Sequence, residues 1–263
     1  DMNSRDIVRA LEQMGGVRDA EADRINADYL IMVWTLAGIL VSNTVTVTMT
    51  VMGCMINDEE NKRLASFYVA PVKRIYVALS YIFSAWIIGI MMCLITLAVF
   101  QGYMAVTGQA LFAGAVCLQL LGMIILNSFV YASAAYLIAL FVHSMSAWSG
   151  LLTIIGTLVG FVGAIYLPMA ALPEKVADVL KCLPVLHGTA MMRVVCTAEA
   201  VENTFAGLPA EAAEVFREEM GITVVMGDGP VSFSVQVVYL LVLGLVIITA
   251  AAFISRKRSL YDR

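Results

Sequence analysis

The chain has 263 residues, of which 61% are hydrophobic and 14% are charged, and its formal net charge is −4. A soluble globular domain carries about 25% charged residues. This composition, with a mean hydropathy of +0.88, excludes a self-contained soluble domain. No block of basic residues is long enough to indicate a nucleic-acid partner.

Three long stretches contain no Asp, Glu, Lys or Arg: Tyr29–Asn57, Ile75–Pro173 and Gly229–Ser255. About 20 apolar residues cross the ~30 Å hydrocarbon layer as a helix, where charged side chains are costly. We therefore predict an all-α fold, a polytopic helical bundle in a membrane. Five spans are expected, at Tyr29–Ile56, Ile75–Phe100, Leu111–Phe141, Ala147–Leu167 and Ser232–Ile254.

The polar segments between the spans predict the topology. Lys and Arg are enriched on cytoplasmic flanks, which places the loop 57–74 and the tail 256–263 in the cytoplasm. The insertion 168–231 and the N-terminal segment 1–28 then lie outside, although the latter holds four arginines. Within segment 1–28, Ile7 and Leu11 belong to a short amphipathic helix that Gly15–Gly16 would end. Because an odd number of spans starts outside, we expect one more span before Asp1.

The loop 57–74 has the pattern of a short amphipathic helix at 58–69. Asn57 is a candidate N-cap, with Glu60 three residues later as in a capping box. Leu64, Phe67 and Tyr68 fall on one face, and Pro71 would end the helix. By itself this pattern favours a helix that lies in the lipid headgroup layer.

Two motifs resemble those of type-2 ATP-binding-cassette (ABC) exporter permeases over the region from about Tyr29 to the end. The first is the acidic, basic and apolar helix followed by Pro71-Val72-Lys73-Arg74 and a new span. The second consists of Pro168, Leu172-Pro173, Pro184 and Arg193 after the fourth span. The family usually has six spans with both ends in the cytoplasm. The chain departs from the pattern at Lys62-Arg63-Leu64, where a glycine is often found.

The resemblance implies that a separate ATPase subunit binds the loop helix and drives export. Leu64, Phe67 and Tyr68 would form the contact ridge. Its rim of ion pairs would comprise Glu59, Glu60, Lys62 and Arg63. The working unit would contain two permease halves, identical or different, and two ATPase subunits in the cell membrane. ATP and Mg²⁺ would bind to the ATPase, because this chain has no phosphate-binding loop. We therefore expect that this chain is not an enzyme and binds no cofactor of its own.

Polar side chains inside the spans have two interpretations. Asn43, Thr44, Thr48 and Asn127 either form hydrogen bonds between helices or line a substrate path. Asn43 is the preferred path residue, because the resembling family places its span beside the central cavity. Such a mildly polar path suits an amphiphilic or apolar substrate, such as a drug, a peptide or a lipid.

Gly156 and Gly160 form a Gly-x-x-x-Gly pair in the fourth span, which permits close helix approach. The pair serves either packing within the chain or the contact between two permease halves. In the insertion, the sequence does not decide whether Cys182 and Cys196 form a disulfide. Leu208–Gly221 has the pattern of a further helix, with Pro209 in its first turn.

Other functional classes fit the sequence less well. A secondary transporter usually needs carboxylates or histidines within the membrane, and His143 lies only at the edge of a loop. The two histidines join no metal-ligand pattern. A membrane scaffold or immunity protein without transport activity remains the alternative to an exporter subunit.

Overall fold

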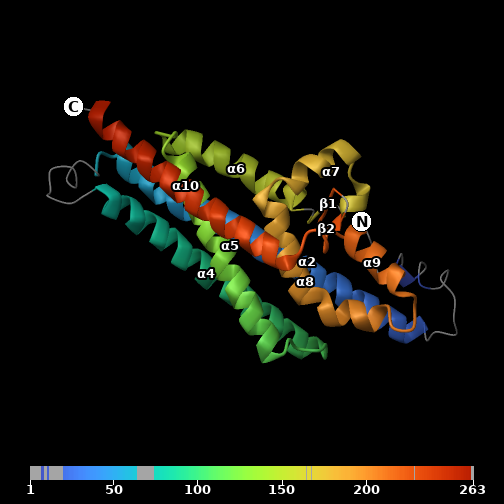
Figure 1. Ribbon diagram of the computed structural model, residues 1–263. Coiled ribbons are helices and arrows are strands. Elements are labelled where there is room, and N and C mark those ends of the chain that lie inside the picture. The colour runs from blue at the N-terminus through green and yellow to red at the C-terminus, as the bar shows by residue number, and fades with distance from the viewer. Residues whose placement is uncertain are drawn as a thin grey trace. The chain divides into compact units, whose positions relative to one another are not determined.

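The computed structural model describes residues 7–8, 11, 20–63, 74–163, 165–166, 168–227 and 229–261, which are helical apart from turns and one short hairpin. Figure 1 labels the main elements. In chain order they are α2 (Ala20–Glu60), α4 (Arg74–Thr107), α5 (Gly114–Ala139), α6 (Met145–Val162), η1 (Met169–Ala171), α7 (Glu174–Lys181), α8 (Pro184–Thr204), α9 (Ala210–Glu219), β1 (Val225–Met226), β2 (Gly229–Pro230) and α10 (Phe233–Tyr261).

Five helices, α2, α4, α5, α6 and α10, are long and apolar enough to cross a membrane. They coincide with the five predicted runs, so the prediction of an all-α membrane bundle is confirmed. α2 has 41 residues, which at 1.5 Å per residue makes a helix about 60 Å long. That is about twice the thickness of the hydrocarbon layer, so the polar ends of α2 extend beyond it.

The predicted ends of three helices were wrong. α2 begins at Ala20, inside the segment 1–28, where Glu21 and Asp23 lie in its first turn and interact favourably with the helix dipole. α4 passes through Gly102 to Thr107, and the turn comes at Gly108, whose φ is +71°. α10 continues past Arg256 to Tyr261. Hydropathy indicates which residues of a helix lie in lipid. The helix itself extends further, until a residue interrupts its backbone hydrogen bonds.

The described chain divides into two compact units; α2, α4 and α5 each contribute long segments to both, whereas α6 and α10 belong almost wholly to the second. The second unit contains Ser42–Thr96, Ile124–Val159 and Val237–Arg263. Its core is made by methionines of α2, small residues of α4 and α5, and the buried ring of Trp148 from α6. The indole N–H of Trp148 donates a hydrogen bond to the carbonyl of Met49 at 3.2 Å.

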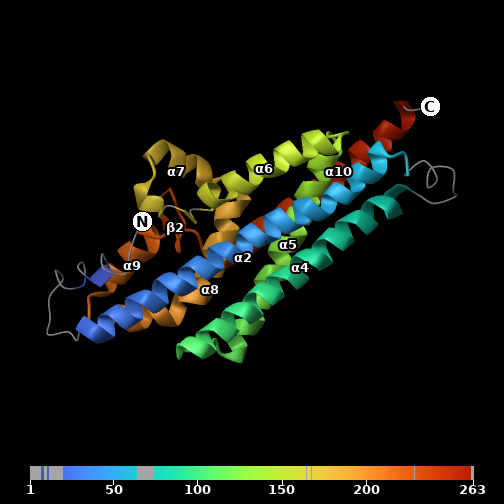
Figure 2. The ribbon, with the colours of Figure 1, turned by 180° about the vertical axis from the view of Figure 1, so that it is seen from behind.

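The first unit contains the chain up to Val41 together with Leu97–Met123 and Gly160–Gln236. Ile7 and Leu11 are helical and buried in it, as the amphipathic pattern predicted. α8 runs beside the first part of α2, as Figure 2 shows and as the contact between Arg193 and Trp34 confirms. Thirteen of the 21 residues of α8 are buried, so this helix is the centre of the unit.

The insertion 168–231 is folded within the first unit. α7 and α8 meet at a bend of 80°, and the Nε2 atom of His187 lies 2.8 Å from the carbonyl oxygen of Lys181 across that bend. The predicted helix at Leu208–Gly221 is confirmed as α9, with Pro209 as its N-cap and Gly221 at a φ of +63° after its end. β1 and β2 then form an antiparallel hairpin.

Candidate functional site

The polar end of α2 is built differently from the predicted loop helix. Asn57 does not cap a new helix, because α2 continues through Asp58 to Glu60. The helix ends where Lys62 adopts a φ of +57°. The amide of Lys62 bonds to the carbonyl of Glu59 at 3.0 Å, and the amide of Arg63 bonds to that of Asp58 at 2.9 Å. These two bonds define a Schellman cap, whose left-handed position normally holds glycine.

Asp58 connects the end of α2 to α4. The hydroxyl of Tyr81 donates a hydrogen bond to the Asp58 carboxylate at 2.7 Å, and an Arg63 guanidinium nitrogen lies 3.4 Å from the other carboxylate oxygen. A carboxylate in the last turn of a helix is disfavoured by the helix dipole. Both partners offset that cost, since each stabilises the negative charge.

Glu60 connects the end of α2 to the start of α6. Its carboxylate accepts a hydrogen bond from the backbone N–H of Met145 at 2.9 Å, and Met145 is the first residue of α6. The first amides of a helix have no partner within the helix, and the dipole favours an anion there. Glu60 therefore acts as a cap supplied by a distant helix end.

The predicted ATPase contacts are described only in part. Lys62 and Arg63 are exposed beyond the end of α2, while Glu59 and Glu60 belong to its last turn. Leu64, Phe67 and Tyr68 lie outside the described residues, and so does the second half of the predicted helix at 58–69. A contact between these residues and an ATPase stays a prediction.

The four predicted path residues lie in the second unit in two environments. Thr44, Thr48 and Asn127 are completely buried within the chain. The Thr48 hydroxyl bonds to the carbonyl of Thr44 in its own helix at 2.6 Å. Asn43 is part-exposed, and its side-chain amide donates to the Thr96 hydroxyl at 2.8 Å, from α2 to α4. This bond is the interhelical role that the sequence offered as one interpretation, whereas a substrate path stays a prediction.

A glycine brings α2, α4 and α5 together beside these residues. A Cβ atom at Gly89 of α4 would lie 3.1 Å from the Thr48 methyl and 3.3 Å from the Ser128 hydroxyl. The Ser128 oxygen is buried and has no hydrogen-bond partner among the described residues. The polar side chains thus lie in a tightly packed interior in this structure.

Gly156 and Gly160 both pack against their own chain. The nearest atom to a Cβ at Gly156 would be the Thr46 methyl, at 3.9 Å. A Cβ at Gly160 would lie only 2.1 Å from the ring of Tyr166, which also packs edge-on against Phe161. The close approach at Gly160 is therefore made within the chain. A contact of this face with a second permease stays a prediction.

Arg193 links α8 to α2 and to the end of α9. Its side chain is fully buried, and its guanidinium lies 4.1 Å from the centroid of the Trp34 ring. One guanidinium nitrogen donates to the carbonyls of Met220 at 3.1 Å and Gly221 at 3.3 Å. The indole N–H of Trp34 donates to the same Met220 carbonyl at 3.0 Å. We call Trp34, Arg193, Met220 and Gly221 the arginine junction.

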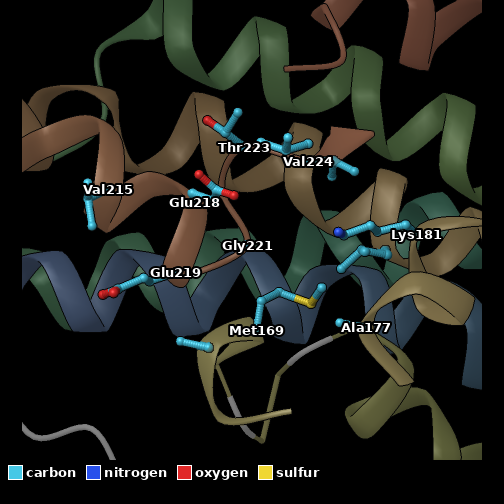
Figure 3. A pocket seen from close by; sticks show the side chains of 12 residues that line it. Met169, Ala177, Lys181, Val215, Glu218, Glu219, Gly221, Thr223 and Val224 are labelled. Carbon is cyan, nitrogen blue, oxygen red and sulfur yellow. The ribbon is translucent and has the colours of Figure 1, made fainter. Parts of the chain in front are cut away.

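A pocket of about 320 Å³ opens in the insertion beside this junction (Figure 3). Its walls come from η1, α7, α8, α9 and the segment that leads into β1. The lining residues are Met169, Ala170, Ala177, Lys181, Leu186, Val215, Glu218, Glu219, Gly221, Thr223, Val224 and Val225. Nothing in the local sequence pattern predicted this pocket, because its residues come from five separate segments.

None of the five cysteines forms a disulfide in this structure. Cys196 is buried, whereas Cys182 is exposed and its thiol lies 3.6 Å from the carbonyl of Asp178. The disulfide that the sequence left open between them is therefore not formed. In the part of the chain that the structure describes, no three His, Cys, Asp or Glu side chains gather as a metal site.

Sequence reasoning assigned Asp58 and Glu60 to the wrong helix and missed Trp34. Arg193 carried a signal, because it is an isolated base in the apolar stretch from Pro184 to Cys196, and such a charge is rarely buried unless it is paired. Its partners lie 27 and 159 residues away, beyond any local pattern.

Comparison with known proteins adds one finding to this geometry. Residues 18–253 match the family described as ABC-2 family transporter protein. The match includes all five spanning helices except the C-terminal end of α10, together with the whole insertion. No curated protein sequence matches the chain.

Proposed function

The chain belongs to the ABC-2 family of transporter proteins and is the membrane-spanning permease part of such a transporter; on this premise we propose that it works as an exporter subunit driven by a separate ATPase. The ATPase dimer binds ATP and Mg²⁺ and contacts the loop between α2 and α4. Closure of that dimer moves the loop and changes the arrangement of the spanning helices.

The connections made by the end of α2 support this proposal most strongly. Asp58 accepts a hydrogen bond from Tyr81 of α4, and Glu60 accepts one from the first amide of α6. A force on the end of α2 therefore acts on α2, α4 and α6 together, within one compact unit. Coupling of this kind needs a packed and hydrogen-bonded connection rather than a loose tether.

The proposed topology follows from the distribution of bases. The loop 57–74 and the end of the chain lie in the cytoplasm, because both are rich in Lys and Arg. The insertion 168–231 lies outside the cell membrane. Two permease halves, each a copy of this chain or a related one, form the transporter.

The proposed substrate is amphiphilic or apolar, as drugs, many peptides and lipids are. The interior of the spans supports this class, since the side chains of Asn43, Thr44, Thr48 and Asn127 are polar but uncharged. The mild polarity of these side chains suits hydrogen bonding and apolar contact rather than the binding of an ion.

Affinity purification from the native membrane tests the ATPase partnership. A tagged chain should retain a subunit that hydrolyses ATP, and Phe67→Asp should lose both that subunit and transport while still inserting into the membrane. Phe67→Leu is the matched control, because it keeps an apolar side chain of similar size and should retain the subunit. A wild-type chain without any ATPase, or a Phe67→Asp chain with normal transport, would contradict the proposal.

The exposed thiol of Cys182 tests the topology separately. A membrane-impermeant maleimide added to intact cells should label the chain, and Cys182→Ser should abolish that labelling. The same reagent should reach a cysteine placed at Lys62 only after the cells are opened. Labelling at position 62 from outside would reverse the proposed orientation.

A further inference from the structure

The pocket in the insertion combines an apolar floor with an acidic side. Met169, Leu186 and Val224 form part of the floor, and Leu186 and Val224 are buried. Figure 3 shows Glu218 near Thr223 and Val224, with the ammonium group of Lys181, a residue of α7, pointing toward the same space. A volume of about 320 Å³ is at the small end of the ~300–1,000 Å³ range of small-molecule sites.

The charge left uncompensated at the pocket is negative. Lys181 is paired with Asp178 at 3.2 Å, so its charge is balanced within α7. Glu218 and Glu219 form no ion pair with any residue that the structure describes. α9 carries four glutamates against one arginine. A neighbouring hollow is lined by three of these glutamates, Glu211, Glu214 and Glu218, and by Arg217. A positively charged ligand complements this side.

The walls of the pocket are held in place before any ligand binds. Arg193 bonds to the carbonyls of Met220 and Gly221, and the amides of Ile222 and Thr223 bond to the carbonyl of Arg217 at 2.8 and 3.0 Å. The bond between His187 and the carbonyl of Lys181 fixes the opposite wall. A rigid site loses little conformational entropy on binding, so even a small ligand can be held.

We propose that this pocket binds a small organic cation with an apolar body, such as an aryl-alkyl amine. The ammonium group donates to the carboxylate of Glu218, to which Glu219 adds negative charge on the same side of the pocket, and the apolar body lies on the floor between α7, α8 and α9. The proposal rests on the pocket alone, so it holds whether or not the chain works with an ATPase. In the proposed topology the ligand arrives from outside the cell.

Three probes of one shape test the proposal on the full chain in phosphatidylcholine nanodiscs: 4-phenylbutylamine, neutral 4-phenylbutan-1-ol and anionic 4-phenylbutyrate. Binding is measured by calorimetric titration, and a titration of each probe into empty nanodiscs is subtracted to correct for partitioning into lipid. The amine should bind saturably and about tenfold more tightly than the alcohol, the factor that a hydrogen bond to a charged group supplies. The anion should bind more weakly than either.

Two pairs of substitutions identify the site. Glu218→Gln/Glu219→Gln should reduce amine affinity to that of the alcohol and leave alcohol binding unchanged. Glu199→Gln/Glu202→Gln removes the same charge from exposed positions of α8 that do not line the pocket, and it should leave amine binding unchanged. Ala177→Phe should fill the pocket and abolish binding of both the amine and the alcohol.

Several outcomes would overturn the proposal. These are equal affinity for amine and alcohol, wild-type amine binding by Glu218→Gln/Glu219→Gln, or equal losses in the two glutamine pairs. The glutamine variants change only exposed side chains, so their results stand even if Ala177→Phe fails to fold.

Discussion

The guanidinium of Arg193 lies 4.1 Å from the centroid of the Trp34 ring and donates to the same Met220 carbonyl as the Trp34 indole. A cation over an aromatic face and a shared acceptor thus join α2, α8 and the end of α9. Water is excluded from this junction, because Arg193 is fully buried and Trp34 is 8% exposed.

Arg193→Met should destabilise the protein by about 2–4 kcal/mol, since it removes the cation–π contact and leaves buried carbonyls without their donor. Trp34→Phe keeps the aromatic face and loses one hydrogen bond, so its cost should be about 1 kcal/mol. Thermal unfolding of the purified variants in detergent measures both. Equal unfolding temperatures for Arg193→Met and the wild type would show that the junction contributes nothing.

Glu60→Ala should weaken the start of α6 and cost about 1 kcal/mol, as the loss of an N-terminal cap does. Glu60→Gln keeps a side-chain oxygen for the amide of Met145 and should retain most of the stability. The same pair separates two roles in transport assays. If Glu60 acts mainly as a cap, Glu60→Gln transports normally; if its charge contacts the ATPase, both variants fail.

Lys62→Gly should stabilise the end of α2, because Lys62 holds a left-handed conformation at a φ of +57°. The side chain costs about 1–2 kcal/mol there relative to glycine. Lys62→Ala loses the same charge but keeps a Cβ atom, so it serves as the control. The unfolding temperature should rise for the glycine variant alone. A rise of equal size in both variants would attribute the effect to charge.

Gly160→Ala should displace the ring of Tyr166, since the new Cβ would lie 2.1 Å from it. The cost should be about 1–3 kcal/mol, as for other overpacked sites. In a Tyr166→Ala background the same change should cost much less, and the double-mutant cycle measures the difference. If Gly160→Ala instead separates the two permease halves both in the wild type and in the Tyr166→Ala variant, the glycine lies at a contact between chains.

The five spans and the helix α9 were predictable, because each depends on neighbours along the chain. A run of apolar residues that lacks charge determines where a helix can lie in lipid, and Pro209 and Gly221 mark the ends of α9 whatever surrounds them. The end of α2 was not predictable in this way. Asn57 and Glu60 match a capping box locally, but the preceding helix had no residue to stop it before Lys62.

The order and approximate positions of the spanning helices were thus determined by the sequence alone, since the choice between lipid and water is made segment by segment. The tertiary structure alone decided that Glu60 would cap α6, that Arg193 would lie over Trp34, and that α7, α8 and α9 would enclose a pocket. Each of these depends on contact between segments that lie far apart in the sequence. Tertiary packing brings these segments together, and the periodicity of the sequence does not reveal which segments will meet.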